Sequence, residues 1–283
     1  MIELIPELNK LQGLIPDPNL VENLVWGLVL GFIAASASYK LKFLTADGAV
    51  AAFILAVDLF GLGGWKWSLP ILVFFMTSSF LSRFRKYHNT EVEGFFEKSG
   101  MRDSQQVLAN GGIGGLLVIF DFIFHSGIFY LVYVGILATV CADTWATEIG
   151  TLFRTRTYNI LNFKTVEQGV SGGISVPGTT GALLGTLIVA FSASVWINIP
   201  LFQYFCTVTS AGLMGCFLDS VLGATVQAGF ICSVCGRISE KRYHCNRKTQ
   251  HKKGIVWFNN DMVNLIAGLS GGVFIIIFRI ILL

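Results

Sequence analysis

Carboxylates and threonines alternate in CADTWATEIG, residues 141–150, at the end of a long apolar stretch. Thr144 and Glu148 are four residues apart, as are Asp143 and Thr147, so each pair shares one face of a helix. Mg²⁺ is a hard cation that takes one or two carboxylates together with the phosphate oxygens of a substrate. This segment therefore predicts a magnesium site, and a hydrogen-bonded cluster between helices is the alternative.

Glycines and threonines crowd GVSGGISVPGTTGALLG, residues 169–185. Pro177 fits the first turn of a helix, where its missing N–H costs nothing. The residues after it would present unpaired backbone N–H groups at the positive end of the helix dipole, and glycines would let a ligand approach the backbone. The predicted phosphate-binding residues are Gly172, Gly173, Gly178 and Thr179. Close helix packing on Gly181 and Gly185 is the alternative.

Two more polar segments, LDSVLGATVQ and NNDMVN, end one apolar stretch and begin another. Asp219 would be buried about eight residues, or ~12 Å, from its helix end. It shares a face with Gly223, which leaves room for a metal or a phosphate. Asn260 and Asn264 share a face at the start of the last helix, although amides there can simply act as caps. Intramembrane polar groups are costly, so four such segments predict one shared site.

Cysteine and histidine cluster in the polar loop 229–254. The loop opens with a Cys-x₂-Cys pair followed by Gly, which is typical of half a zinc site. The candidate ligands are Cys232, Cys235, His244, Cys245 and His251. Cys245 would form the second half of the site together with either His244 or His251. A metal-free loop and a redox pair are the alternatives. Thiols stay reduced in the cytoplasm, which argues against a disulfide and favours structural zinc.

The elements that must position these residues are membrane-spanning helices. Of the 283 residues, 13% are charged and 53% hydrophobic, and the mean hydropathy is +0.66. Soluble domains carry about 25% charged residues, so a soluble globule and a disordered chain are both excluded. The apolar stretches cover residues 21–38, 47–63, 67–82, 107–125, 128–146, 177–198, 201–227 and 259–282. We expect a single all-α domain, residues 21–283, with about eight transmembrane helices, of which the second and third are short enough to be tilted or re-entrant.

Lys and Arg fall mainly on one side of this predicted bundle. The loops 39–46, 83–106, 147–176 and 228–258 hold 17 of the 20, and the other side holds 3. The positive-inside rule makes these loops cytoplasmic and puts both termini outside the cytoplasm. Residues 1–20 have one Lys and no signal cleavage site, which predicts an interfacial segment. Because topology explains the net charge of +3, no nucleic-acid partner is expected.

The chain resembles the integral membrane family that includes the plant phytyl-phosphate kinases. The motifs that carry the resemblance are CADTWATEIG, GVSGGISVPGTTG, GCFLDSVLGATVQ and NNDMVN in this order, with FFMTSSFLSRFRK and QQVLANGG upstream. The resemblance implies a multi-spanning kinase, in a bacterial inner membrane, that converts a prenyl monophosphate such as phytyl or geranylgeranyl phosphate to the diphosphate. It implies a nucleoside triphosphate donor, with CTP favoured, and Mg²⁺. Some members lack a cysteine-rich loop, which implies that this loop is peripheral to the chemistry.

The resemblance and the residue pattern together suggest roles for the polar residues. The catalytic, magnesium-binding carboxylates would be Asp143, Glu148 and Asp219. The residues that bind or orient phosphate, besides those of the glycine segment, would be Asn110, Thr144, Lys164, Ser220, Gln227, Asn260, Asp261 and Asn264. No strong general base is required, because the acceptor phosphate is already an anion. Two other functions use similar residues: an ion-coupled transporter of a small or lipid anion, and a cytidylyltransferase that makes a CDP-lipid.

Overall fold

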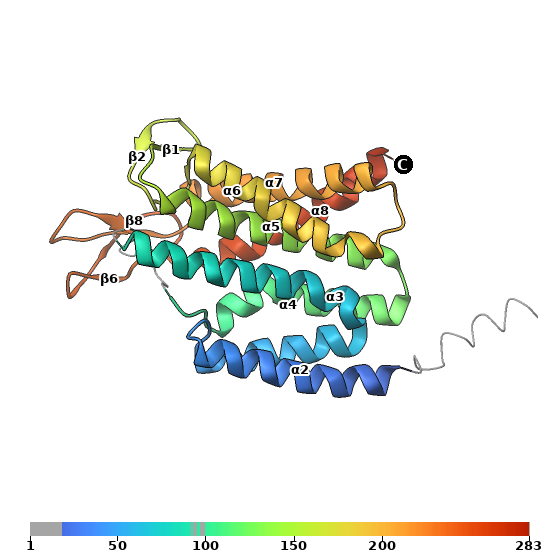
Figure 1. Ribbon diagram of the computed structural model, residues 1–283. Helices are drawn as coiled ribbons and strands as arrows, with labels where there is room; N and C mark the ends of the chain where they lie inside the picture. Colours follow the sequence, from blue (N-terminus) through green and yellow to red (C-terminus); the bar gives the residue numbers. More distant parts are fainter. Residues whose placement is uncertain (1–18, 91, 93–94, 97–99, 283) are drawn as a thin grey trace, which may run out of the picture.

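Long helices form an antiparallel bundle in the computed structural model, which describes residues 19–90, 92, 95–96 and 100–282 (Figure 1). They are α2 (Leu20–Lys40), α3 (Ala46–His88), α4 (Ser104–Phe124), α5 (Gly127–Leu152), α6 (Val176–Ala193), α7 (Leu201–Thr225) and α8 (Asn260–Leu282). A short 3₁₀ helix, η2 (Ser194–Trp196), follows α6. In the described part of the chain, seven helices are long and apolar enough to cross a membrane. The predicted interfacial segment lies almost entirely outside the described residues.

Helix α3 supplies two crossings rather than one. It is 43 residues long, but Gly64 (φ +60°, ψ −152°) breaks it, and the two parts run in opposite directions (Figure 1). Arg102 contacts both ends of α3: its carbonyl accepts from the Thr45 N–H at 3.0 Å, and its guanidinium donates to Ser79 Oγ at 3.0 Å. Lys66, beside the break, instead approaches a carboxylate near the last turn of α4. The predicted second and third spans therefore form a hairpin, and the all-α bundle of about eight crossings is confirmed.

Helix α5 runs through the middle of the bundle, and most of its residues between Tyr130 and Ala142 are buried (Figure 1). Helix α6 packs against it through small residues. A methyl group on Gly181 would lie 2.6 Å from the Trp145 carbonyl oxygen, and one on Gly185 would lie 2.8 Å from that of Cys141. Only glycine permits so close an approach between two helices. The packing interpretation of these two glycines is therefore correct.

Short strands lie at one end of the bundle, which we call the strand-bearing end (Figure 1). Between α5 and α6, an antiparallel sheet of order β2-β1-β3 is formed by β1 (Thr157–Asn159), β2 (Thr165–Val166) and β3 (Gly173–Ile174). Between α7 and α8, β4 (Gly229–Ile231), β5 (Ile238–Ser239) and β8 (Gln250–Lys253) form an antiparallel sheet of order β5-β4-β8, and β6 (Tyr243–His244) pairs with β7 (Arg247–Lys248). The cysteine loop is therefore a small β-structure outside the bundle.

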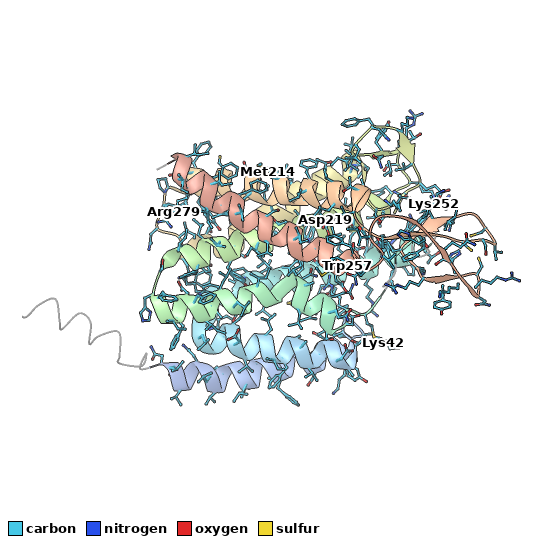
Figure 2. All side chains as sticks on the ribbon, turned by 180° about the vertical axis from the view of Figure 1, so that it is seen from behind. Lys42, Met214, Asp219, Lys252, Trp257 and Arg279 are labelled. Carbon is cyan, nitrogen blue, oxygen red and sulfur yellow. The ribbon has the colours of Figure 1, made fainter. Side chains whose placement is uncertain are left out.

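Basic residues gather at the strand-bearing end. Figure 2 shows Lys42 and Lys252 there, and Arg279 at the opposite end. Of the Lys and Arg that the structure describes, only Lys66 and Arg279 belong to the opposite end. Asp219 lies inside the bundle toward the strand-bearing end (Figure 2). The uneven charge distribution seen in the sequence is thus an asymmetry between the two ends of the molecule.

Candidate active site

A cavity of about 230 Å³ lies at the strand-bearing end, among the ends of helices α3 to α8. The predicted site residues that line it are Asn110, Asp143, Thr144, Glu148, Gly172, Gly173, Gly178, Thr179, Asp219, Ser220, Gln227, Asn260, Asp261 and Asn264. The four polar segments are far apart in the chain, and the structure brings them to one place. We call this space the acidic cavity because five carboxylates line its wall.

Lys164 is the predicted phosphate-binding residue that lies elsewhere. Its side chain is exposed and does not line the acidic cavity. It ends a tight turn after β1, where its N–H donates to Asn162 Oδ1 at 3.0 Å and its carbonyl accepts from the Asn159 N–H at 2.9 Å. The structure therefore does not place this lysine with the other predicted site residues.

Two aspartates meet inside the acidic cavity. Asp143 of α5 and Asp219 of α7 have their carboxyl groups in direct contact, and Glu240 is close enough to interact with both electrostatically. Carboxylates that share a site repel each other when both are ionised. A cation bound among them would remove that repulsion, and one or two carboxylates suit a divalent metal such as Mg²⁺.

Three oxygen atoms on the cavity wall are buried without a hydrogen-bond partner among the described residues. They are Asn110 Oδ1, Asp219 Oδ2 and Asn264 Oδ1. Leaving a buried polar atom unpaired costs about 1–3 kcal/mol. All three atoms are acceptors, so the missing partner is a cation or a donor. Mg²⁺ prefers oxygen ligands, and these residues therefore fit it.

Glu148 has a different partner. Its Oε2 accepts a hydrogen bond from Arg85 Nε at 2.5 Å, and both residues are buried, Arg85 with only 3% of its surface exposed. Hydrogen bonds between two charged groups are among the strongest in proteins. Glu148, which was predicted as a magnesium ligand, lines the acidic cavity and holds the Arg85 guanidinium at its wall.

The start of α6 does not offer the unpaired N–H groups that we expected. Ser175 caps this helix: its Oγ accepts from the Gly178 N–H at 3.2 Å and its carbonyl accepts from the Thr179 N–H at 2.8 Å. Gly172, with φ of +83°, lies against Ala224, so a methyl group there would clash with the backbone of α7. The glycines permit close packing around the cavity. The expectation of a phosphate cradle at these N–H groups is wrong, because it ignored the serine cap.

Glu240 is the site residue that the sequence analysis missed. It comes from the cysteine loop, and its Oε1 accepts from Ser171 Oγ at 2.8 Å and from Gln227 Nε2 at 2.7 Å. Gln227 Nε2 also lies 3.5 Å from Asn260 Oδ1. A usable signal existed: Glu240 is the only acidic residue in residues 229–258, among seven Lys and Arg. The cysteine loop therefore reaches the wall of the acidic cavity, closer to the predicted site than the resemblance implied.

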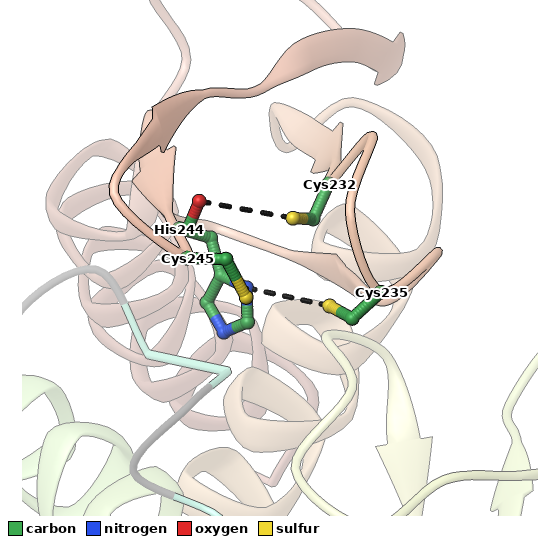
Figure 3. A group of neighbouring side chains, drawn as sticks. All are labelled: Cys232, Cys235, His244 and Cys245. Atoms are coloured by element: carbon green, nitrogen blue, oxygen red, sulfur yellow. Dashed lines mark hydrogen bonds between the residues drawn. The ribbon is translucent and has the colours of Figure 1, made fainter.

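Four metal-binding side chains lie together in the cysteine loop (Figure 3). The ligand atoms of Cys232, Cys235, His244 and Cys245 are all within 4.8 Å of one another. Tetrahedral zinc with Zn–S bonds of about 2.3 Å places its ligands about 3.8 Å apart, so this group fits zinc. His251 lies outside it, with its ring against an aromatic side chain of β4. The structure thus selects His244 over His251 as the fourth candidate ligand.

A tight turn lets the adjacent His244 and Cys245 face the same point. Cys245 and Asn246 both have positive φ, +51° and +56°, as a type I′ hairpin turn requires. His244 Nδ1 lies 3.2 Å from the sulfur of Cys245 and 3.5 Å from that of Cys235. The backbone N–H of Cys235, with His244, lowers the pKa of Cys232 to about 6. A lowered pKa favours the thiolate, which is the form that binds metal.

The fold and the cavity define an integral, multi-pass membrane protein with a carboxylate-lined site at one end of its helix bundle. The chain belongs to the family described as integral membrane protein DUF92, whose profile matches residues 29–272. Together with the relatives below, this match confirms the family that the motifs indicated, the one that includes the phytyl-phosphate kinases.

Relatives occur in plants and archaea. Protein PGR of Arabidopsis thaliana is 30% identical over 268 residues, covering 86% of this chain and 92% of PGR. Protein VTE6, chloroplastic, of the same plant is 27% identical over 229 residues, which are 79% of this chain but 61% of VTE6. The uncharacterized membrane protein MJ0933 of Methanocaldococcus jannaschii is 27% identical over 237 residues, covering 83% and 85% of the two chains. No solved structure matches the chain.

Proposed function

We propose that the protein is a membrane kinase that transfers a phosphoryl group from a nucleoside triphosphate to a prenyl monophosphate. CTP is the favoured donor, and phytyl or geranylgeranyl phosphate is the favoured acceptor, both by family resemblance. The observation that carries the proposal is the acidic cavity, where a pair of carboxylates, one of them with an unpaired oxygen, and two unpaired amide oxygens face one space. Such a wall suits a divalent cation and its bound polyphosphate.

Each side of the acidic cavity has a part in this mechanism. Asp143 and Asp219 would hold Mg²⁺, with the amide oxygens of Asn110 and Asn264 beside them. The bound Mg²⁺ would neutralise the charge of the donor phosphates. Arg85, fixed by Glu148, would contact the phosphoryl group that is transferred. Phosphoryl transfer needs mainly positioning and charge neutralisation from the protein, and this set of residues supplies both.

The reaction balances without a proton-accepting side chain. An oxygen of the acceptor phosphate forms a bond to the γ-phosphorus as the bond from that phosphorus to the bridging oxygen breaks. The products are a lipid diphosphate and a nucleoside diphosphate. The acceptor oxygen is already anionic, so no general base is needed.

The acidic cavity would open to the cytoplasm. It shares the strand-bearing end with 16 of the 18 Lys and Arg that the structure describes, and the positive-inside rule assigns such an end to the cytoplasm. Nucleoside triphosphates are then available on the side where the cavity opens. Both chain termini would lie on the other side.

The cysteine loop would bind structural zinc through Cys232, Cys235, His244 and Cys245. Four protein ligands close the coordination shell, as in structural rather than catalytic zinc sites. Glu240 lies between the two halves of this ligand set in the sequence. Zinc would therefore hold in place the loop that carries Glu240 into the acidic cavity.

Product analysis tests the proposal against its alternatives. The purified protein in lipid is given geranylgeranyl monophosphate, Mg²⁺ and each nucleoside triphosphate in turn, and lipids are read by mass spectrometry. A lipid diphosphate formed with an equal amount of nucleoside diphosphate is the expected result. A CDP-lipid would show a cytidylyltransferase instead. No product with any donor, from folded protein, would favour a transporter.

A further inference from the structure

A second cavity, of about 440 Å³, lies beside the acidic cavity at the strand-bearing end. It is bounded by the loop after α2, the last turns of α3 and the residues just before α4. Four basic residues line it: Lys42, Arg83, Lys86 and Arg102. Among the described residues of its lining there is no Asp or Glu. We call it the basic groove.

The basic groove and the acidic cavity meet at shared residues. Ser82, Gly100 and Arg102 line both of them. Arg102 is held at this junction, because its Nη1 donates to Ser79 Oγ at 3.0 Å and its guanidinium lies 5.5 Å from the Phe75 ring centroid. A group bound in the groove would therefore be adjacent to the acidic cavity, with one fixed cation between them.

The two spaces suit anions of different kinds. The acidic cavity has five carboxylates, so a nucleoside triphosphate fits there only together with its metal ions. The basic groove needs no metal to attract an anion, because its own side chains are cationic. A single phosphate monoester, which has no tightly bound Mg²⁺ of its own, matches the groove.

An apolar surface adjoins the groove at Phe43, which is part of the groove lining. The Phe43 ring lies 5.7 Å from that of Phe80, and the Phe80 and Phe84 side chains are more than half exposed. Leu41, in the groove lining, is half exposed as well. These residues lie at the end of membrane-crossing helices, where exposed apolar side chains contact lipid. A ligand can therefore place its phosphate in the groove while its chain stays in the bilayer.

We infer that the basic groove binds the phosphate monoester head of an apolar-chain lipid, with the chain along the Phe80 and Phe84 surface. The identity of this lipid as the phosphoryl acceptor rests on the proposed function. Its binding does not depend on any reaction. The acidic cavity would then hold the metal and nucleotide, with Arg102 between the two substrates.

Equilibrium binding of radiolabelled geranylgeranyl monophosphate tests this inference, on the full chain in phosphatidylcholine nanodiscs without nucleotide. The test variant is Lys42→Gln with Arg83→Gln. The matched control is Arg156→Gln with Lys164→Gln, which removes two exposed cations at the same end that line neither cavity. At the strength typical of basic residues acting on anionic lipids, two cations correspond to about a 30-fold loss of affinity.

We expect that loss in the test variant, affinity within about twofold of the wild type in the control, and unchanged affinity for Mg²⁺–nucleotide in both. Equal losses in the two double variants, or none in either, would overturn the inference. So would inorganic phosphate or the phosphodiester lipid phosphatidylglycerol competing as well as the prenyl phosphate, since the first would mean that the chain is not used and the second that any anionic lipid binds. A selective binding loss in a protein without kinase activity would support the groove while refuting the proposed function.

Discussion

The aspartate pair gives the sharpest test of the acidic cavity, through the substitution Asp219→Asn. Asp219 is 9% exposed, contacts Asp143, and has an unpaired Oδ2. Asparagine keeps the shape and one acceptor oxygen but removes the charge. If the pair binds Mg²⁺, the substitution must weaken metal binding and turnover, whereas a purely structural hydrogen-bond cluster would lose little.

The size of the effect follows from the charge removed. Two unit charges about 4 Å apart interact by about 4 kcal/mol at an effective dielectric constant of about 20. A loss of about 4 kcal/mol in the transition state lowers kcat/KM about 10³-fold. Mg²⁺ carries two charges, so this value is a conservative one.

Stability without metal should change much less. Asp143 and Asp219 contact each other directly, and two carboxyl groups that share a site hold a proton between them rather than both ionising. The amide introduced by Asp219→Asn keeps this contact, so the unfolding temperature of the metal-free protein should stay within about 2–4 °C of the wild type. The rise on adding Mg²⁺, which reflects binding to the folded state, should largely disappear.

The assay pairs turnover with thermal unfolding, each measured with and without Mg²⁺. Asp58→Asn is the matched control, because Asp58 is a half-buried carboxylate of α3 that lies beside Gly115 of α4 and does not line the acidic cavity. The control should keep the activity and the Mg²⁺-dependent stabilisation of the wild type. Turnover of Asp219→Asn within about tenfold of the wild type, or an undiminished Mg²⁺ effect on its unfolding temperature, would refute the reasoning.

Three further predictions concern the residues around the acidic cavity. The protein should hold one zinc ion per chain by elemental analysis. Cys235→Ser should lose this zinc, whereas the control Cys206→Ser, which alters an exposed cysteine of α7, should keep it. A full zinc content in Cys235→Ser would contradict the assignment. Glu240→Gln removes a charge beside the aspartate pair but leaves the fold of the cysteine loop intact. The affinity for Mg²⁺, measured by titration, should therefore fall about tenfold while the zinc content stays unchanged. An unchanged Mg²⁺ affinity would mean that Glu240 acts only in packing. Arg85→Gln leaves Glu148 buried without its cation and should lower the free energy of unfolding by about 3–5 kcal/mol, measured by denaturation in detergent. Adding Glu148→Gln should restore most of this loss, and a single variant as stable as the wild type would contradict the buried pair.

The amino-acid sequence by itself determined the architecture of this protein. Apolar stretches of membrane length dictate helices, because a backbone inside the bilayer must satisfy its own hydrogen bonds. Their number fixes which loops share an end, so the convergence of CADTWATEIG, LDSVLGATVQ and NNDMVN could be predicted without any contact being known. The two membrane crossings within Ala46–His88 were also predictable. The two apolar parts of this segment are separated by glycines, and glycine can adopt the positive φ that Gly64 has.

Only the tertiary structure decided which groups meet inside that end. Helical periodicity tells which residues share a face, but not which neighbour that face meets. The contact of Asp143 with Asp219 therefore became visible only in three dimensions, as did the pairing of Glu148 with Arg85. Both depend on how α5 is rotated against its neighbours, and that rotation is set by close packing on small residues such as Gly181.

Loop geometry was equally inaccessible from the sequence. The cap by Ser175, the turn at Lys164 and the entry of Glu240 into the acidic cavity depend on backbone hydrogen bonds and turns outside the membrane. Water can satisfy an exposed backbone in many conformations, so a loop is far less constrained than a helix in lipid. Hydropathy thus settled the bundle and the end that holds the site, while packing and local hydrogen bonds settled the role of each residue within it.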